Sequence, residues 1–156
     1  MAYLSFIEQT MHYFDRPHQS VCIEPVACPA AWRGAELPPL EELAYRLKPA
    51  EVEEVCRAVD HAAALAKPTK ELTREDFPLS LLANRIADWR SQLAGGLGFQ
   101  VVRGIPVERW NQDEAELFFW CFGLHVGRPG EQNPDGDLLG HVIDTGDSQR
   151  DSMVRL

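Results

Sequence analysis

Histidine and carboxylate side chains provide the first candidates for metal binding or acid–base chemistry in this sequence. His12, Asp15 and His18 lie close together near the amino terminus. A metal site needs ligands held in fixed geometry, whereas this segment has no regular spacing and is interrupted by Pro17. We therefore expect these three side chains to be solvated.

His141 and Asp144 form a second candidate pair. The surrounding residues, Leu138 to Thr145, are predicted to form a strand, in which successive side chains point to opposite faces. Two residues that are three positions apart then lie on opposite faces, so His141 and Asp144 are not expected to share one ion. We predict neither a metal site nor a catalytic residue within the chain.

Two other kinds of active site are also disfavoured. The glycines from Gly95 to Gly98 precede a predicted strand, whereas a phosphate-binding loop must open a helix. No pairing of a nucleophile with a base, as a hydrolase requires, follows from local spacing. Free thiols remain, without any CxxC pair, at Cys22, Cys28, Cys56 and Cys121.

Composition and charge favour a protein of the cytoplasm. The 156 residues are 45% hydrophobic and 25% charged, which is typical of a globular domain or part of one. The formal net charge of −9 disfavours nucleic acid as a partner. Neither a secretory signal nor an apolar run of the roughly 20 residues that span a bilayer is visible, so we expect no membrane association.

The chain is predicted to consist of a proline-rich arm, residues 1–47, and a domain from residue 48 to residue 156. Prolines break helices and remove strand hydrogen bonds, so we expect the arm to be extended and rich in loops, with Trp32 docked on the domain. The prolines concerned are Pro17, Pro25, Pro29, Pro38 and Pro39, with Pro49 just beyond.

Hydrophobic spacing in the domain predicts helices over about Pro49–Ala66 and Leu79–Leu93, and a third beginning after Asn111 as N-cap. Strands are predicted over Gly98–Pro106 and Leu138–Thr145. The residues expected to face the core are Val52, Val55, Cys56, Val59 and Ala63 in the first helix, Leu82, Ile86, Trp89 and Leu93 in the second, and Ala115, Phe118, Phe119, Phe122 and Val126 in the third.

The segment from Phe77 to Gly146 resembles the amino-terminal part of the TauD/TfdA-like iron(II)/2-oxoglutarate-dependent dioxygenases. In that family a helix leads into a strand of the form GFxVVRGxP, which here is GFQVVRGIP at Gly98–Pro106. A helix with acidic and aromatic residues follows and ends in GLHVG at Gly123–Gly127. A turn at Gln132–Gly136 and the strand HVIDTG at His141–Gly146 complete the likeness, which extends only loosely to the first half of the chain.

The resemblance implies an α+β fold, with amino-terminal helices followed by the first strands of a jelly-roll. It also implies that the full-length protein binds Fe(II) and 2-oxoglutarate and oxidises a small organic substrate. In the family a His-x-Asp pair and a distant histidine bind the iron, mainly on the carboxyl-terminal side of this segment. Asn133, Asp144 and Arg103 are the substrate-side candidates in the full-length protein, whereas Arg103 could equally be a surface charge at the end of a strand.

No histidine of this sequence is followed two positions later by a carboxylate. We therefore expect the chain to be an incomplete front part of the dioxygenase, inactive alone, without bound cofactors and able to associate through an exposed apolar sheet face. The apolar–polar alternation at the last residues, Met153–Leu156, fits that expectation. The alternative is a small non-catalytic binding domain, which would have to close its own hydrophobic core.

Overall fold

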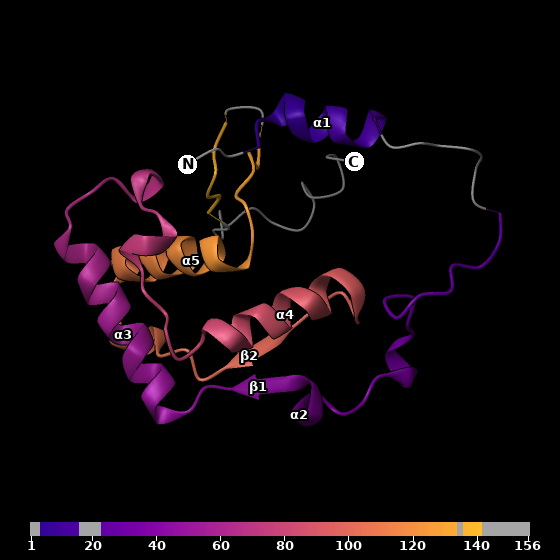
Figure 1. Ribbon diagram of the computed structural model, residues 1–156, viewed down its shortest axis with the longest axis horizontal. Helices are drawn as coiled ribbons and strands as arrows, with labels where there is room; N and C mark the ends of the chain where they lie inside the picture. Colours follow the sequence, from indigo (N-terminus) through magenta and orange to yellow (C-terminus); the bar gives the residue numbers. More distant parts are fainter. Residues whose placement is uncertain (1–3, 16–22, 134–135, 142–156) are drawn as a thin grey trace, which may run out of the picture.

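The computed structural model describes residues 4–15, 23–133 and 136–141. This part of the chain combines five α-helices, four short 3-10 helices and two strands, so it is α+β in character (Figure 1). In chain order the elements are α1 (Phe6–Phe14), η1 (Gly34–Glu36), α2 (Leu40–Leu43), β1 (Ala44–Arg46), α3 (Pro49–Ala64), η2 (Thr69–Glu71), η3 (Arg74–Asp76), α4 (Ala83–Gly95), β2 (Val101–Arg103), η4 (Val107–Arg109) and α5 (Gln112–Val126).

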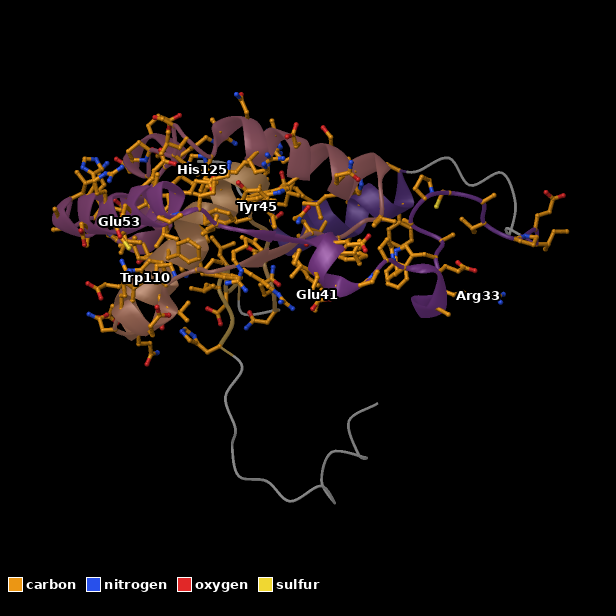
Figure 2. The ribbon with its side chains drawn as sticks, turned by 90° about the horizontal axis from the view of Figure 1, so that it is seen from below. Arg33, Glu41, Tyr45, Glu53, Trp110 and His125 are labelled. Atoms are coloured by element: carbon orange, nitrogen blue, oxygen red, sulfur yellow. The ribbon has the colours of Figure 1, made fainter. Side chains whose placement is uncertain are left out.

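The two strands form a parallel pair in which Tyr45 is the register partner of Val102. Helix α4 lies along one face of this pair (Figure 1). The side chain of Tyr45, labelled in Figure 2, comes from β1. Its ring meets the Trp89 ring of α4 edge-on, with centroids 5.5 Å apart, and the guanidinium of Arg85 lies over the Tyr45 ring. Tyr45 and Val102 pack against the hydrophobic core on the α4 side of the pair.

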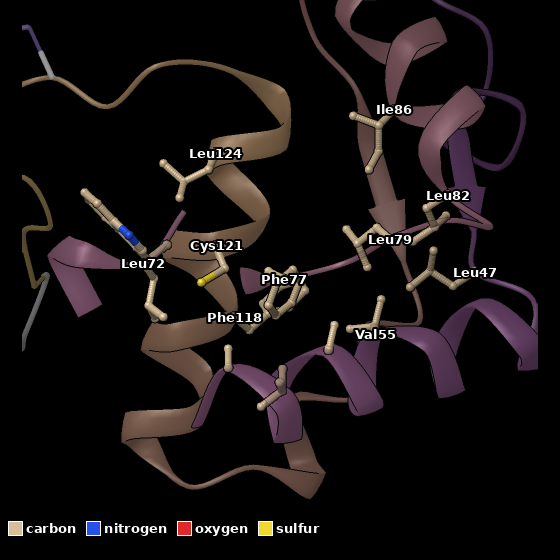
Figure 3. Packing of buried hydrophobic residues seen from close by; sticks show 14 of the residues in the cluster. Leu47, Val55, Leu72, Phe77, Leu79, Leu82, Ile86, Phe118, Cys121 and Leu124 are labelled. Carbon is tan, nitrogen blue, oxygen red and sulfur yellow. The ribbon is translucent and has the colours of Figure 1, made fainter. Parts of the chain in front are cut away.

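The hydrophobic core lies where α3, α4 and α5 meet the loop before α4 (Figure 3). Phe77 is fully buried at this meeting point, and its ring lies 6.4 Å from that of Phe118 on α5. Aromatic rings bury large apolar areas, so this contact fixes α5 against the loop. The other fully buried large side chains are Leu72, Leu82, Val55, Val59 and Cys121.

Helices α3 and α5 confirm the predicted helices, but their buried faces differ in part from the prediction. Pro49 begins α3, as expected from its fixed φ angle. The Asn111 side chain caps α5 by accepting the Glu114 N–H at 3.0 Å, which confirms the predicted capping box. In α3 the core receives Ala58 and Ala62 rather than Ala63, whereas in α5 it receives Trp120, Cys121 and Leu124 while Phe119 is 67% exposed.

The second predicted helix begins later than expected, because the residues up to Leu82 form a turn that only leads into α4. Leu93 is exposed rather than buried, whereas Leu82, Ile86 and Trp89 face the core as predicted. The predicted strand at Gly98–Pro106 is confirmed only at its centre, where β2 spans three residues. Of the other predicted strand, residues 138–141 are not strand, and 142–145 lie outside the described residues.

The amino-terminal arm is more ordered than its prolines indicated. Residues 6–14 form α1, which begins with a capping box between Ser5 and Glu8, and β1 belongs to the sheet of the domain. Trp32 docks as predicted: its Nε1–H donates to the Leu97 carbonyl at 2.9 Å, and its ring packs edge-on against Phe99. In the described part, no helix combines the length and the apolar character needed to cross a bilayer.

Candidate functional site

A concave, mostly apolar surface lies between α5 and the returning segment, residues 127–133 and 136–141. It consists of two adjoining cavities of about 470 and 300 Å³, which share Phe119 and Leu139 as a common wall. The chain turns back on itself because α5 ends at Gly127 and is followed by Pro129 and Gly130. The exposed Phe119 ring thus belongs to a groove, which explains why it does not enter the core.

The larger cavity has a polar end formed by Gln112, Glu116 and His141. The Glu116 carboxylate accepts a hydrogen bond from Gln112 Nε2 at 2.8 Å and lies 2.8 Å from His141 Nε2. These two contacts, that of Gln112 first, lower the pKa of Glu116 below its ordinary value. Glu116 therefore stays an acceptor at neutral pH, while His141 carries the proton of the shared hydrogen bond. Together they can hold a polar group at one end of an apolar groove.

The smaller cavity is bounded by Trp120 and Arg128. The Trp120 side chain is only 5% exposed, and its Nε1–H has no acceptor among the residues that the structure describes. An unpaired buried donor costs about 1–3 kcal/mol, so it is an uncommon feature of a folded protein. Arg128 is exposed at the rim, and the remaining walls of this cavity are mostly apolar.

The returning segment is held in place by the amino-terminal residues. Leu4 bridges to it in parallel: its N–H donates to the Pro129 carbonyl at 3.0 Å, and its carbonyl accepts from Glu131 N–H at 3.1 Å. The Gln9 side chain donates to the Leu4 and Glu131 carbonyls at 3.2 and 3.0 Å. The start of α1 therefore fastens one wall of the groove.

Of the residues predicted for the substrate side, Asn133 lies beside the groove. Its side chain closes a turn, with Oδ1 accepting from the Asp137 N–H at 3.0 Å and Nδ2 donating to the Asp137 carboxylate at 2.9 Å. Arg103 ends β2 and is not among the residues that line the groove, so the structure does not bring it together with Asn133. Asp144 lies outside the described residues.

The pair formed by Glu116 and His141 does not follow from the sequence. Local spacing pairs His141 only with Asp144, whereas Glu116 lies 25 positions earlier, on α5. The contact depends on the path of the chain after α5, and no local sequence pattern indicates it.

His125 has a structural role. Its Nε2 atom donates to the Phe77 carbonyl at 2.7 Å, and its ring packs against that of Phe77. Partial burial lowers the pKa of His125, so the ring remains neutral at physiological pH. This contact ties the end of α5 to the loop before α4 and leaves His125 outside the groove.

Within the three described ranges, no three histidine, cysteine, aspartate or glutamate side chains come together in a way that could hold a metal ion. Glu116 and His141 offer two ligand groups but no third. The described residues therefore do not fit the two-histidine, one-carboxylate iron site that the resemblance implies.

No family model matches the chain. It is similar, however, to FR-33289 synthase from Streptomyces rubellomurinus (strain ATCC 31215), with 26% identical residues over 131 aligned positions. The aligned region covers 84% of this chain but 39% of the synthase, so the chain spans about two fifths of the length of that relative. The match makes this chain similar to part of that synthase.

Proposed function

We propose that this chain is the front part of a dioxygenase-like enzyme of the TauD/TfdA-like kind, which oxidises a small organic substrate. The observation that carries this proposal is the similarity to FR-33289 synthase over 84% of the chain. The order of the motifs GFQVVRGIP, GLHVG and HVIDTG supports it, since each falls where the family has its own. The 39% coverage of the synthase is what a front part of an enzyme would give.

The small size of the β1–β2 sheet also supports an incomplete assembly. The described residues contain two strands of three residues each, paired in parallel. Parallel strands usually belong to a larger sheet that is covered by other elements. In the proposed enzyme, other residues supply the further strands.

Iron(II) with 2-oxoglutarate supplies oxidation by molecular oxygen in enzymes of this kind, releasing succinate and carbon dioxide. Since the described residues lack a three-ligand set, we assign the iron ligands and the co-substrate site to other residues of the enzyme. The described residues have a different role in this proposal. The groove along α5 presents Phe119 and Leu139 as an apolar wall and Glu116 with His141 as a hydrogen-bonding end, next to the turn that Asn133 closes.

Two measurements test the proposal. First, the genomic sequence downstream of the codon for Leu156 should encode a His-x-Asp within a few tens of residues, and the protein that includes it should release succinate from 2-oxoglutarate. Second, anaerobic Fe(II) titration of the 156-residue chain, followed by calorimetry, should show no tight stoichiometric site. A stop codon directly after Leu156, or one tightly bound Fe(II) per folded chain, would contradict it.

A second function, a non-catalytic binding domain, is favoured by one observation. The described part closes a core of its own, in which Val55, Val59, Leu72, Phe77 and Leu82 have no exposed surface. A folded core together with an apolar groove is sufficient for a small binding module. Cooperative, reversible unfolding of the monomeric chain, combined with a stop codon after Leu156, would establish this alternative in place of the enzyme.

A further inference from the structure

The carboxyl ends of the two parallel strands place two arginines side by side. Arg46 ends β1, Arg103 ends β2, and the two are register partners. Neighbouring strands lie about 4.8 Å apart, so the two side chains start from adjacent positions on one face of the pair. Like charges directly opposite each other in a sheet destabilise it, so their presence needs an explanation.

A third positive charge follows this pair along the chain. Tyr45 and Leu47 point toward the core, since Tyr45 meets Trp89 and Leu47 is only 7% exposed. Strand alternation therefore turns Arg46 to the opposite face. Lys48 lies two residues after Arg46, directly before α3, and its side chain is exposed.

No carboxylate of the described residues neutralises these three cations. None of the ion pairs and side-chain hydrogen bonds within residues 4–15, 23–133 and 136–141 involves the side chains of Arg46, Lys48 or Arg103. The carboxylate next along the chain, Glu51, is turned to the core side, where it accepts from the Tyr45 hydroxyl at 2.8 Å and from the Lys48 backbone N–H at 2.7 Å. This arrangement is unusual in a chain with 24 acidic and 15 basic residues.

A glycine next to Arg103 leaves space beside the side chain of Arg46. Gly104 follows Arg103 with a φ of +85°, a conformation that favours glycine. A Cβ atom at this position would lie 3.8 Å from the Cγ of Arg46, so glycine leaves the flank of the Arg46 stem uncovered. Arg103 is partly buried, and a partly buried charge attracts an anion more strongly than a fully solvated one.

We propose that Arg46, Lys48 and Arg103 form a binding site for a tetrahedral oxyanion with two negative charges, either phosphate or the phosphoryl group of a small molecule. Each guanidinium presents a planar fork of N–H donors that suits a pair of oxygens. A tetrahedral dianion has enough oxygens to accept from both forks and from the Lys48 ammonium together. A single carboxylate has two oxygens and satisfies only one fork fully. This site is independent of the dioxygenase proposal.

Isothermal titration calorimetry on the full chain in low-salt buffer tests this site with inorganic phosphate, glycerol phosphate and acetate. Arg46→Gln combined with Arg103→Gln should weaken phosphate binding at least about tenfold, because charged hydrogen bonds are lost. The matched control, Arg57→Gln with Arg90→Gln, removes the same charge from exposed positions on α3 and α4 and should bind as the wild type does. Arg46→Lys with Arg103→Lys keeps the charge without the forks and should give intermediate affinity.

Tighter binding of glycerol phosphate than of inorganic phosphate would identify a phosphorylated small molecule as the ligand, and the reverse order would identify free phosphate. Both results support the site if the Arg46 and Arg103 variant abolishes the difference. Equal loss in the control variant would mean an adventitious ion only and would overturn the proposal. Preference for acetate, or no phosphate binding by the folded wild-type chain, would also overturn it, the former pointing to a carboxylate from a protein segment. Circular dichroism verifies that each variant is folded.

Discussion

The carboxylate of Glu54, on α3, caps the start of α4 by accepting the backbone N–H groups of Leu81 and Leu82 at 2.7 and 3.1 Å. The first N–H groups of a helix have no partner within the helix, and here no side chain of α4 itself caps them. Glu54 is only 6% exposed, so its charge is compensated by these donors rather than by water. One buried side chain thus sets the position of α4 relative to α3.

Glu54→Ala should lower the free energy of unfolding by about 2–4 kcal/mol, because it leaves two N–H groups without an acceptor in a largely buried place. Urea denaturation followed by circular dichroism measures this loss. Glu53→Ala is the matched control, since Glu53 forms only a solvent-exposed ion pair with Arg109 at 3.1 Å. Equal losses in the two variants would show that the cap is not formed.

Truncation of the neighbouring residues Phe118 and Phe119 should change the free energy of unfolding by very different amounts. Phe118 is 7% exposed and contacts the rings of Phe77, Trp110 and Phe122, so Phe118→Ala should cost about 3–5 kcal/mol in unfolding free energy. Phe119 is 67% exposed on the groove, so Phe119→Ala should change stability by less than about 0.5 kcal/mol. Thermal unfolding of both variants checks the assignment, and a large loss for Phe119→Ala would place that ring in the core instead.

Asp76 should titrate with an unusually low pKa. Hydrogen bonds from Lys67 Nζ, from the Thr73 backbone N–H and from the Thr73 hydroxyl lower the pKa of Asp76 from 3.8 to about 2. A lowered pKa in the folded state stabilises the fold above pH 3.8, and this contribution is lost as the pH falls through about 2.

Carbon-13 NMR titration of the carboxyl groups measures the Asp76 pKa directly. Lys67→Met removes the first of the three contacts and should raise this pKa toward 3.8. Lys70→Met, in the same loop but outside this hydrogen-bond cluster, should leave it unchanged. A normal pKa in the wild-type chain would show that the Lys67 contact does not persist in solution.

Cys121 should be the least reactive thiol of the described residues. Burial, with a smaller effect of the Asp76 charge, raises the pKa of Cys121 to about 12, and the side chain has no exposed surface. The thiolate, which is the reactive form, is therefore scarce below that pH. Maleimide labelling at mildly alkaline pH, located by peptide mass spectrometry, should modify the exposed Cys28 long before Cys121. Comparable rates in the folded chain would contradict the packing of α5.

Local rules were sufficient for the elements whose signals lie within one turn. Pro49 begins α3, and Asn111 with Glu114 begins α5, as their sequence patterns predicted. A capping box of the same kind, Ser5 with Glu8, begins α1, which the prediction of a loop-rich arm did not include. The prolines limit the helix to residues 6–14 rather than prevent it.

The parts that could not be predicted depend on residues distant in sequence. Phe119 is exposed because a different side of α5 packs against Phe77. The spacing of apolar residues along α5 is compatible with more than one buried face, so it does not determine which side that is. The β1–β2 pair joins residues 57 positions apart through strands of three residues each, too short for an alternation pattern. Glu54 reaches Leu81 across 27 positions, and the pairing of Glu116 with His141 spans 25.

The parallel bridge between Leu4 and Gly130 joins the beginning of the chain to one wall of the groove, which is formed by residues much later in the sequence. Closing so long a loop adds little entropic cost beyond that of a shorter one, because the cost grows only logarithmically with length. The long separation in sequence therefore adds little to the entropic cost of forming the bridge between Leu4 and Gly130. Deleting residues 4–15 would remove the contacts of Leu4 and Gln9 with residues 129–131, whereas none of the described core residues lies in this segment. The first described residues thus contact one wall of the groove without forming part of the hydrophobic core.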